Sequence, residues 1–125
     1  MEKIFTDKAP AAIGPYSQAM VVGSLVYTSG QIPINPASGE IEATDIVGQT
    51  EQVCRNLEAV LTAAGASLTS VVKTTCFLAD MADFAAFNSV YSKYFTACPA
   101  RSCVAVKALP KGSLVEIEAI AEISH

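Results

Sequence analysis

The chain has 125 residues and a mass of 13.1 kDa, which suits a single domain over residues 1–125. Hydrophobic residues make up 51% of it and charged residues only 16%, a composition that excludes a disordered chain and implies a buried core. Eight basic and 12 acidic residues give a net charge of −4, and the scattered basic residues argue against a nucleic-acid groove. So little charge on a small domain also predicts that copies of the chain cover apolar surface, and we expect a homo-oligomer.

Two features of the sequence bear on where the protein resides. No apolar run approaches the roughly 18 residues that a membrane-spanning helix needs. Residues 1–10 lack the apolar segment of a signal peptide. We therefore expect a cytoplasmic protein with no membrane partner. In that compartment its cysteines are expected to stay reduced; they are Cys54, Cys76, Cys98 and Cys103.

The scarcity of histidine excludes several kinds of catalytic site. The only histidine, His125, is the last residue, and no Cys-x-x-Cys motif occurs, so a zinc site of ordinary ligand spacing cannot be assembled. A Ser-His-Asp triad and a Cys-His pair are excluded for the same reason. Any catalysis must use carboxylates, arginine, backbone groups and water.

The first predicted elements are strands. A short strand is expected at residues 3–6. Residues 18–22 and 25–29 are rich in β-branched residues and are separated by Gly23-Ser24, which is typical of a two-residue hairpin with a type II′ turn. The next stretch, residues 30–44, contains two prolines and two glycines and is predicted to be a loop.

A helix is predicted to follow this loop. Asp45 is the expected N-cap, and Gly65 is expected just past the end of the helix. Glu51 and Arg55 stand at i and i+4, which makes Arg55 a surface ion-pair partner. Apolar residues at helical spacing define the buried face of this helix; they are Ile46, Val53, Leu57, Val60, Leu61 and Ala64.

A strand and a second helix come next. Residues 70–79 are rich in β-branched residues and predict a strand. The second helix is expected to begin around residues 80–83 and to end before Pro99. Its predicted buried stripe is aromatic and consists of Phe84, Phe87, Tyr91, Tyr94 and Phe95.

The last two predicted strands, residues 101–107 and 114–123, are joined by residues 108–113. Because side chains alternate between the faces of a strand, one set in each strand should pack under the helices, namely Val115, Ile117, Ala119, Ala121 and Ile123, together with Ser102, Val104 and Val106. The opposite set should face water or another subunit, namely Leu114, Glu116, Glu118, Ile120 and Glu122, together with Arg101, Cys103, Ala105 and Lys107. If these two strands pair across their short connection, Arg101 and Cys103 come close to Glu116 or Glu118 on one face. The element order β-β-α-β-α-β-β predicts an α+β fold, with a mixed sheet and both helices on one of its faces.

Spacing alone favours ordinary structural roles for these side chains. Arg101 and a glutamate can form a cross-strand ion pair, an interaction that contributes roughly 0–1 kcal/mol at a surface. Cys103 lacks a histidine to deprotonate it and is more often a small packed hydrophobe. Asn88 can be a buried amide with satisfied hydrogen bonds, Tyr16 a packing ring, and Ser29-Gly30 the end of a strand.

Four segments of the sequence carry a family resemblance. They are Ala-Pro-Ala-Ala-Ile-Gly-Pro-Tyr-Ser-Gln (9–18), Thr-Ser-Gly-Gln-Ile-Pro (28–33), Pro-Ala-Arg-Ser-Cys-Val (99–104) and Val-Glu-Ile-Glu-Ala-Ile-Ala (115–121). In this order they closely resemble the Rid (YjgF-type) family of reactive-intermediate deaminases, and in particular its RidA-like branch. The resemblance covers essentially the whole chain.

The resemblance implies a chorismate-mutase-like fold, related to the ferredoxin-like fold, assembled as a homotrimer with a central β-barrel and clefts between subunits. It also implies hydrolysis of 2-iminopropanoate and 2-iminobutanoate to 2-keto acids and ammonia without a cofactor. Arg101 matches the family's arginine for the substrate carboxylate, and Glu116 matches its glutamate. Other matching positions that line the family's cleft are Cys103, Tyr16, Ser29, Gly30 and Asn88.

These implied roles suit the chemistry of the side chains. A planar guanidinium pairs with a carboxylate through two hydrogen bonds, so Arg101 can fix both the charge and the orientation of a small acid. Glu116 can activate water and carry a proton to the imine nitrogen. Two other functions stay open: a non-catalytic sensor or regulator that binds a small acid in the same cleft, and, less favoured by the acidic composition, an endoribonuclease or translation inhibitor.

Overall fold

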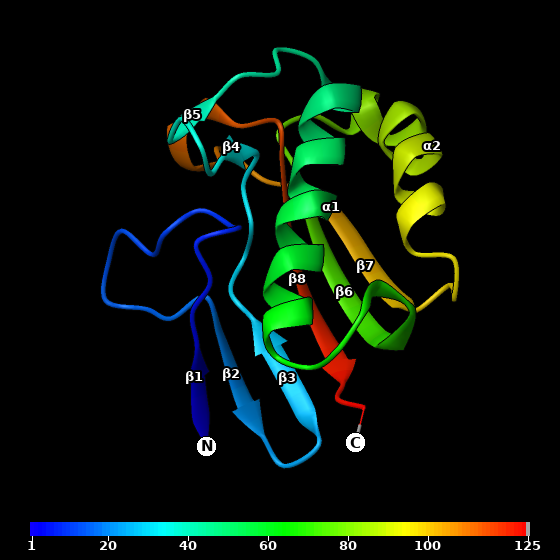
Figure 1. Ribbon diagram of the computed structural model, residues 1–125. Helices are drawn as coiled ribbons and strands as arrows, with labels where there is room; N and C mark the ends of the chain where they lie inside the picture. Colours follow the sequence, from blue (N-terminus) through cyan, green and yellow to red (C-terminus); the bar gives the residue numbers. More distant parts are fainter. Residues whose placement is uncertain (125) are drawn as a thin grey trace.

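The structure, a computed structural model, describes residues 1–124 and shows two helices packed on a mixed β-sheet (Figure 1). The large sheet has six strands in the order β1-β2-β3-β8-β6-β7. Its strands are β1 (Glu2–Ile4), β2 (Ala19–Val22), β3 (Leu25–Thr28), β6 (Val71–Leu78), β7 (Ala100–Ala105) and β8 (Val115–Glu122). The helices are α1 (Ile46–Ala63) and α2 (Phe84–Tyr94). This arrangement confirms the predicted α+β class with both helices on one face of the sheet.

The N-terminal strands follow the sequence prediction closely. Strands β2 and β3 form an antiparallel hairpin in which Val22 pairs with Leu25. Gly23 occupies the turn with a φ of 61°, a conformation that glycine adopts without strain. Strand β1 covers residues 2–4 rather than 3–6 and pairs with β2.

Helix α1 begins and ends where the sequence predicts. The Asp45 carboxylate accepts a hydrogen bond from the backbone N–H of Gly48 at 2.8 Å, which satisfies one of the free donors at the helix start. Gly65, with a φ of 85°, lies just beyond the last residues of the helix. The predicted apolar face of α1 is buried against the sheet and α2, except for Ala64 at the helix end, which is half-buried. Arg55 forms its expected ion pair with Glu51 at 3.7 Å.

The stretch predicted as a loop, residues 30–44, contains two short strands. These are β4 (Ile34–Asn35) and β5 (Glu40–Ile41), which pair with each other and form a separate two-stranded sheet. Gly39, with a φ of 75°, turns the chain between them. A pairing of two residues on each side leaves too little alternation in the sequence to be recognised as a strand.

Short 3₁₀ helices connect several of the remaining elements; they are η1 (Leu68–Ser70), η2 (Met81–Asp83) and η3 (Pro110–Gly112). Asp80 caps η2 by accepting a hydrogen bond from Ala82 at 2.9 Å, and α2 continues directly from η2. In the predicted aromatic stripe of α2, Phe87, Tyr91 and Phe95 are buried, whereas the other two rings are half-buried.

The predicted pairing of the last two strands is wrong. Strand β7 pairs in parallel with β6, and β6 separates it from β8. The reason is that β6, α2 and β7 form a β-α-β unit, in which the helix crosses over the sheet and returns the chain to a parallel neighbour. The connection from β7 to β8 therefore crosses past β6 to reach the strand on its other side, rather than making a tight turn between neighbours.

The register that follows reverses the predicted face of β7. Arg101 and Cys103 pair with Thr74 and Cys76 of β6, and residues paired in this way point to the same side of the sheet. Thr74 and Cys76 are fully buried under the helices, so Arg101, Cys103 and Ala105 also face the helices. Ser102 and Val104, which were predicted to pack there, are exposed on the opposite face, and Val106 lies beyond the strand.

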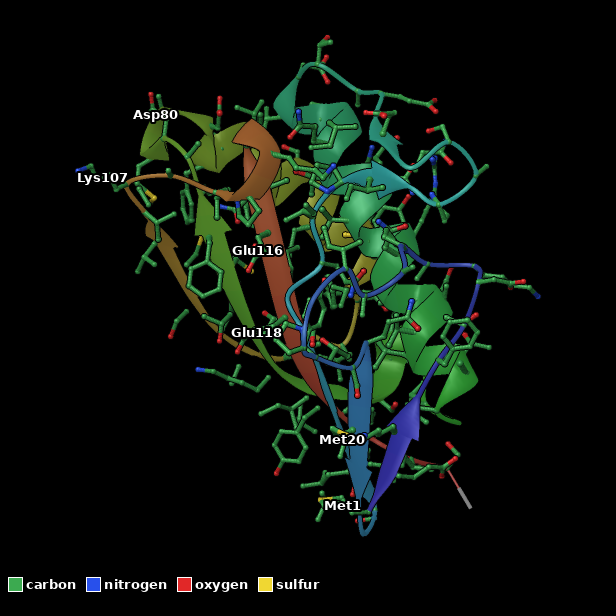
Figure 2. The ribbon with its side chains drawn as sticks, turned by 90° about the vertical axis from the view of Figure 1, so that its left-hand side faces the viewer. Met1, Met20, Asp80, Lys107, Glu116 and Glu118 are labelled. Carbon is green, nitrogen blue, oxygen red and sulfur yellow. The ribbon has the colours of Figure 1, made fainter. Side chains whose placement is uncertain are left out.

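Strand β8 has the predicted alternation. Its inward residues Val115, Ile117, Ala119 and Ala121 are buried in the core, whereas Ile123, also predicted to point inward, lies beyond the strand and is half-buried. Glu116 pairs with Phe77 of β6 and lies, with Glu118, on the face of the sheet away from α1 (Figure 2). We call this second side of the sheet the open face.

The open face is rich in apolar side chains that nothing in residues 1–124 covers. Val22, Tyr27 and Val104 are between 44% and 50% exposed there, which is high for side chains of this kind. Such an apolar face is what the expected homo-oligomer would bury. No helix within residues 1–124 combines the length and apolar character that crossing a bilayer would require.

Candidate functional site

The structure divides the predicted site residues into two groups. Tyr16, Ser29, Gly30 and Glu116 line one pocket on the open-face side of the chain. Arg101, Cys103 and Asn88 lie together under the helices, at the edge of the sheet formed by β7. We describe the first group as the Glu116 pocket and the second as the Arg101 cluster.

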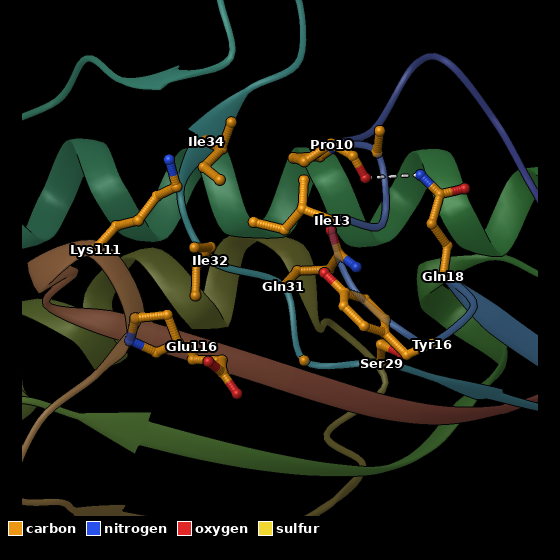
Figure 3. Close-up of a pocket in the computed structure, with 13 residues that line it drawn as sticks. Pro10, Ile13, Tyr16, Gln18, Ser29, Gln31, Ile32, Ile34, Lys111 and Glu116 are labelled. Carbon is orange, nitrogen blue, oxygen red and sulfur yellow. Dashed lines mark hydrogen bonds between the residues drawn. The ribbon is translucent and has the colours of Figure 1, made fainter.

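The Glu116 pocket has a volume of about 440 Å³ and a mostly apolar wall (Figure 3). The wall comes from the N-terminal loop, which contributes Ile13 and Tyr16, and from the segment after β3, which contributes Ile32 and Ile34. Lys111, the one cation on the wall, stands at the end of the pocket away from Tyr16 and Gln18. A small organic molecule with one polar end fits this combination of surfaces.

Gly30 leaves the space that the Glu116 side chain occupies. A Cβ atom at Gly30 would stand only 2.8 Å from Cδ of Glu116, a separation that real side chains do not tolerate. The neighbouring residue Gln31 fixes this approach, because its N–H donates to the carbonyl of Ile117 at 2.8 Å and its carbonyl accepts from the N–H of Ile117 at 3.2 Å. Because Gly30 has no side chain, the Glu116 carboxylate can lie directly against its backbone.

The environment of Glu116 favours its protonated form. Partial burial, and secondarily the nearby carboxylate of Glu118, raise the pKa of Glu116 above its usual value. A carboxyl group with a raised pKa is better matched to proton transfer near neutral pH than an ordinary surface carboxylate.

Two buried amides that the sequence analysis did not identify hold the walls of the pocket. Gln18 donates to the carbonyls of Thr6 and Pro10, at 3.0 and 2.8 Å, and accepts from the N–H of Thr6 at 2.7 Å, so it ties down the N-terminal loop. Asn56 of α1 donates to the carbonyls of Ile32 and Ile34, at 3.1 and 3.0 Å. Of these two residues only Asn56 could have been found from the sequence, because it is a polar residue at a position where the helical pattern of α1 predicts an apolar one.

Ser29 and Tyr16 occupy different parts of the pocket wall, and within residues 1–124 only Ser29 of the two forms a side-chain hydrogen bond there. The Ser29 hydroxyl donates to the carbonyl of Ser17, so the hydroxyl oxygen is left to accept from a ligand. Tyr16 is 51% exposed and forms the outer part of the wall.

In the Arg101 cluster the guanidinium contacts an amide and aromatic rings but, among the described residues, no carboxylate. Nη1 of Arg101 donates to the amide oxygen of Asn88 at 2.7 Å. The guanidinium carbon lies 4.9 Å from the ring centre of Tyr91, 5.5 Å from that of Phe84 and 5.9 Å from that of Phe87, all within cation–π range. Within residues 1–124 the one ion pair joins Arg55 and Glu51, and Arg101 has no carboxylate partner. The cross-strand ion pair considered for Arg101 is therefore wrong.

Cys103 neighbours Arg101 on the helix side of β7 and is half-buried. Burial raises the pKa of its thiol, and the positive charge of Arg101 opposes this only in part. The same cause raises the pKa of Cys76 to about 12 and that of Cys54 further still. Because the reactive form of cysteine is the thiolate, these thiols suit packing better than nucleophilic attack.

The predicted convergence of Arg101, Cys103 and Glu116 on one face of a single chain is therefore wrong. Arg101 and Cys103 face the helices, whereas Glu116 faces the other way, with β6 between their strands. The Arg101 cluster lacks a carboxyl group that can move a proton, and the Glu116 pocket lacks a guanidinium, since its one cation, Lys111, stands at the end away from Tyr16.

Residues 1–124 offer no group of three or more histidine, cysteine or acidic side chains placed to hold a metal ion. His125 lies outside the described residues.

Comparison with known proteins adds to this geometry. Residues 6–123 match the family model described as Endoribonuclease L-PSP. A goat protein named 2-iminobutanoate/2-iminopropanoate deaminase is 52% identical over 119 residues, covering 94% of this chain and 87% of the goat protein. A Lactococcus lactis protein with the name "Putative regulator AldR" is 53% identical over 124 residues, covering 98% of both chains.

A solved structure has the same fold. The crystal structure of Escherichia coli TdcF with bound serine superposes with a TM-score of 0.94, at 45% identity, and covers 99% of this chain and 100% of that one. The two proteins are therefore related in sequence as well as in fold.

Proposed function

We propose that this chain, which belongs to the Rid/YjgF family that the Endoribonuclease L-PSP model describes, hydrolyses small 2-imino acids to 2-keto acids and ammonia. The observation that carries the proposal is the state of Arg101. Its guanidinium rests on three aromatic rings and one amide oxygen, with no carboxylate partner in residues 1–124. A cation built into the protein and left uncompensated is a site for an anion, and its planar fork suits a carboxylate.

The active unit in this proposal contains at least two copies of the chain. Arg101 and Glu116 face opposite sides of one sheet, so one chain cannot bring both to a molecule as small as 2-iminobutanoate. A neighbouring copy that covers the open face can bring its own Arg101 cluster to the Glu116 pocket of the first. A homotrimer closes such contacts in a ring, with each chain giving Arg101 to one site and Glu116 to another.

The reaction needs few groups. The carboxylate of the imino acid binds Arg101, which fixes the C=N carbon in front of the pocket. Glu116 takes a proton from a water molecule as the water oxygen forms a bond to that carbon, and the proton passes to the imine nitrogen. The resulting carbinolamine loses ammonia when its hydroxyl proton moves to nitrogen, the C–N bond breaks and the C=O bond of the keto acid forms.

The raised pKa of Glu116 suits both proton transfers. In each step the group must accept a proton, first from water and then from the carbinolamine hydroxyl, and deliver it to nitrogen, and a pKa displaced toward neutrality serves acid and base roles together. Imines also hydrolyse without a catalyst, so the site needs only orientation and proton transfer, without a strong nucleophile.

A coupled assay tests the proposal. A pyridoxal-phosphate-dependent threonine dehydratase converts L-threonine to the enamine and imine of 2-oxobutanoate, and the release of 2-oxobutanoate is followed with and without this protein. We expect the protein to accelerate release in proportion to its concentration. No acceleration at any concentration would contradict the proposal.

The chain offers a matched control for this assay. Arg101 and Arg55 are its only arginines, and Arg55 lies exposed on α1, paired with Glu51. Arg101→Ala should abolish the acceleration, whereas Arg55→Ala should retain it. Equal loss in both variants would indicate a general effect of lost charge rather than a specific carboxylate site.

Binding of a small acid without turnover is the second candidate. The same Arg101 cluster would hold a keto acid or an amino acid, and two observations favour this use: one relative has the name "Putative regulator AldR", and another is solved with bound serine. Calorimetry with 2-oxobutanoate, together with the coupled assay, separates the two functions, because a sensor binds the acid and leaves the rate of imine hydrolysis unchanged.

A further inference from the structure

We infer that Tyr91, anchored by Thr74, is a positioning residue that sets the direction in which the Arg101 guanidinium points. The inference rests on the proposed function, since it takes the purpose of Arg101 to be the binding of a substrate carboxylate. Tyr91 and Thr74 are both buried, and they act on the acid only through Arg101.

The ring of Tyr91 is the nearest aromatic surface to the guanidinium. Its centre lies 4.9 Å from Cζ of Arg101, closer than the rings of Phe84 and Phe87. Tyr91 is itself fixed by packing, because it stacks on Phe95 with ring centres 4.4 Å apart and an interplanar angle of 25°. An immobile ring under a guanidinium restricts the tilt of that group.

Thr74 connects the ring of Tyr91 back to the strand beside Arg101. Its side chain is fully buried, and its hydroxyl lies 2.7 Å from the hydroxyl of Tyr91. Thr74 is also the direct register partner of Arg101 in the parallel pair of β6 and β7. The Tyr91 ring contacts the Arg101 guanidinium, the Tyr91 hydroxyl contacts the Thr74 hydroxyl, and Thr74 pairs with Arg101 in the sheet. These three contacts form a closed circuit, which fixes the position of Tyr91 relative to the backbone of Arg101.

This circuit also explains why a threonine stands in the core. A buried hydroxyl is costly unless it has a hydrogen-bond partner, and a valine of the same shape would pack there without one. The hydroxyl of Thr74 has the function of holding Tyr91 at a defined height under Arg101.

Asn88 restrains a second degree of freedom. Its amide oxygen takes one N–H of Nη1, which fixes the rotation of the guanidinium in its own plane. Arginine has five N–H donors, and within residues 1–124 the others have no protein acceptor. A fork that is already oriented loses little entropy when it binds a carboxylate, and this raises the affinity.

The test compares Tyr91→Leu with Val90→Ala, which removes core volume from the adjacent position of α2; the rings and the amide that hold the Arg101 guanidinium do not include Val90. Calorimetry with 2-oxobutanoate, the unreactive product, measures carboxylate binding. We expect Tyr91→Leu to raise Kd about tenfold, and KM in parallel, with kcat little changed. Val90→Ala should leave Kd unchanged.

Arginine NMR gives a readout that does not depend on activity. With only Arg55 and Arg101 in the chain, the Nε–H spectrum contains two arginine signals. Removal of the ring current in Tyr91→Leu should move the Arg101 signal and leave that of Arg55 in place. In an Arg101→Lys background, Tyr91→Leu should add little to the loss of affinity, because both substitutions act on the same contact.

If Tyr91→Leu does not fold, the combined variant Thr74→Val/Tyr91→Phe keeps the packing and removes both hydroxyls. We expect it to raise Kd by about threefold. An unchanged Kd and an unchanged Arg101 signal in the folded variants would overturn the inference. A wild-type protein that neither binds 2-oxobutanoate nor accelerates hydrolysis would instead overturn the proposed function, and the Arg101 signal would still decide whether Tyr91 orients this side chain.

Discussion

Arg101 and Glu116 lie on opposite faces of the same sheet, with strand β6 between their strands. If they serve one substrate, as we propose, they come from different copies of the chain. Two variants that are each inactive, Arg101→Ala and Glu116→Ala, should then restore activity when co-expressed. In a randomly mixed homotrimer about a quarter of the sites pair an intact arginine with an intact glutamate. Imine hydrolysis by the mixture should reach about that share of the wild-type rate.

The control for this experiment is a mixture made from the same two purified variants without unfolding or subunit exchange. It should remain inactive. A co-expressed mixture that is also inactive would contradict the two-chain site.

Glu118→Gln should move the pH profile of the reaction. The like charge of Glu118 contributes to the raised pKa of Glu116, so its removal lowers that pKa. The limb of kcat/KM that rises with pH as Glu116 ionises should shift to lower pH. Glu122→Gln, on the same face of β8 but at its exposed end, is the matched control and should leave the limb in place. A shift to higher pH in Glu118→Gln would refute the assignment of the limb to Glu116.

Glu116→Gln should stabilise the protein near neutral pH. The folded state raises the pKa of Glu116 above its value in the unfolded chain, so the proton favours folding and the ionised carboxylate opposes it. The free energy of unfolding of the variant should exceed that of the wild type at about pH 7. The gain should shrink as the pH falls and vanish by about pH 3, where the wild-type carboxyl is neutral in both states. Urea unfolding at equal protein concentrations at both pH values measures the difference, and a destabilised variant at pH 7 would contradict it.

Gly30→Ala should impair turnover more than binding. The added methyl group takes the space of the Glu116 carboxyl, whose flexible end can move aside, so the fold is retained while the proton-transfer group is displaced. We expect kcat to fall about ten- to a hundredfold and the Kd for 2-oxobutanoate to change little. Gly14→Ala, whose new Cβ makes only ordinary contacts with Tyr16 at 3.5 Å, should leave kcat unchanged.

Asn56→Ala should loosen the pocket wall. It leaves the carbonyls of Ile32 and Ile34 without their buried donor, at a cost of about 1–3 kcal/mol in the free energy of unfolding. Hydrogen exchange should increase in the segment from residue 30 to residue 36 before it increases in α1. Uniform exchange throughout the protein would show that Asn56 supports the fold in general rather than this wall.

Much of the fold could be predicted from the sequence, because local signals decide it. Asp45 and Gly65 mark the ends of α1, and Gly23-Ser24 marks the hairpin, through conformational preferences that act within a few residues. The alternation in β8 correctly separated Val115 and Ile117 from Glu116. Such signals require no knowledge of which strands are neighbours.

The face of β7 could not be predicted in the same way. Its alternation is weak, with small or polar residues on both sides, so the assignment depended on the assumed pairing with β8. The true partner is β6, and the parallel register reverses the assignment of Arg101. Resemblance to the Rid family identified Arg101 and Glu116 as a pair of interest, but a list of matching positions contains no information about which face each one occupies.

The support of the site was also beyond sequence reasoning. Tyr91 was predicted as part of a buried stripe, which is correct, but its contact with Arg101 depends on the crossover that places α2 over β7. Gln18 and Asn56 act through hydrogen bonds to backbone carbonyls in segments far from them in the sequence. Tertiary contacts of this kind leave no periodic pattern.

The way in which Arg101 is held has a consequence for the behaviour of the protein in acid. Aromatic faces and a neutral amide surround the guanidinium where a carboxylate would otherwise be expected, and none of these partners gains or loses charge between mild acid and mild alkali. The hold of these partners on the guanidinium should therefore stay constant across that whole interval. Any response of ligand capture to acid would then come from the other end of the proposed site, where the Glu116 of a neighbouring copy changes its charge.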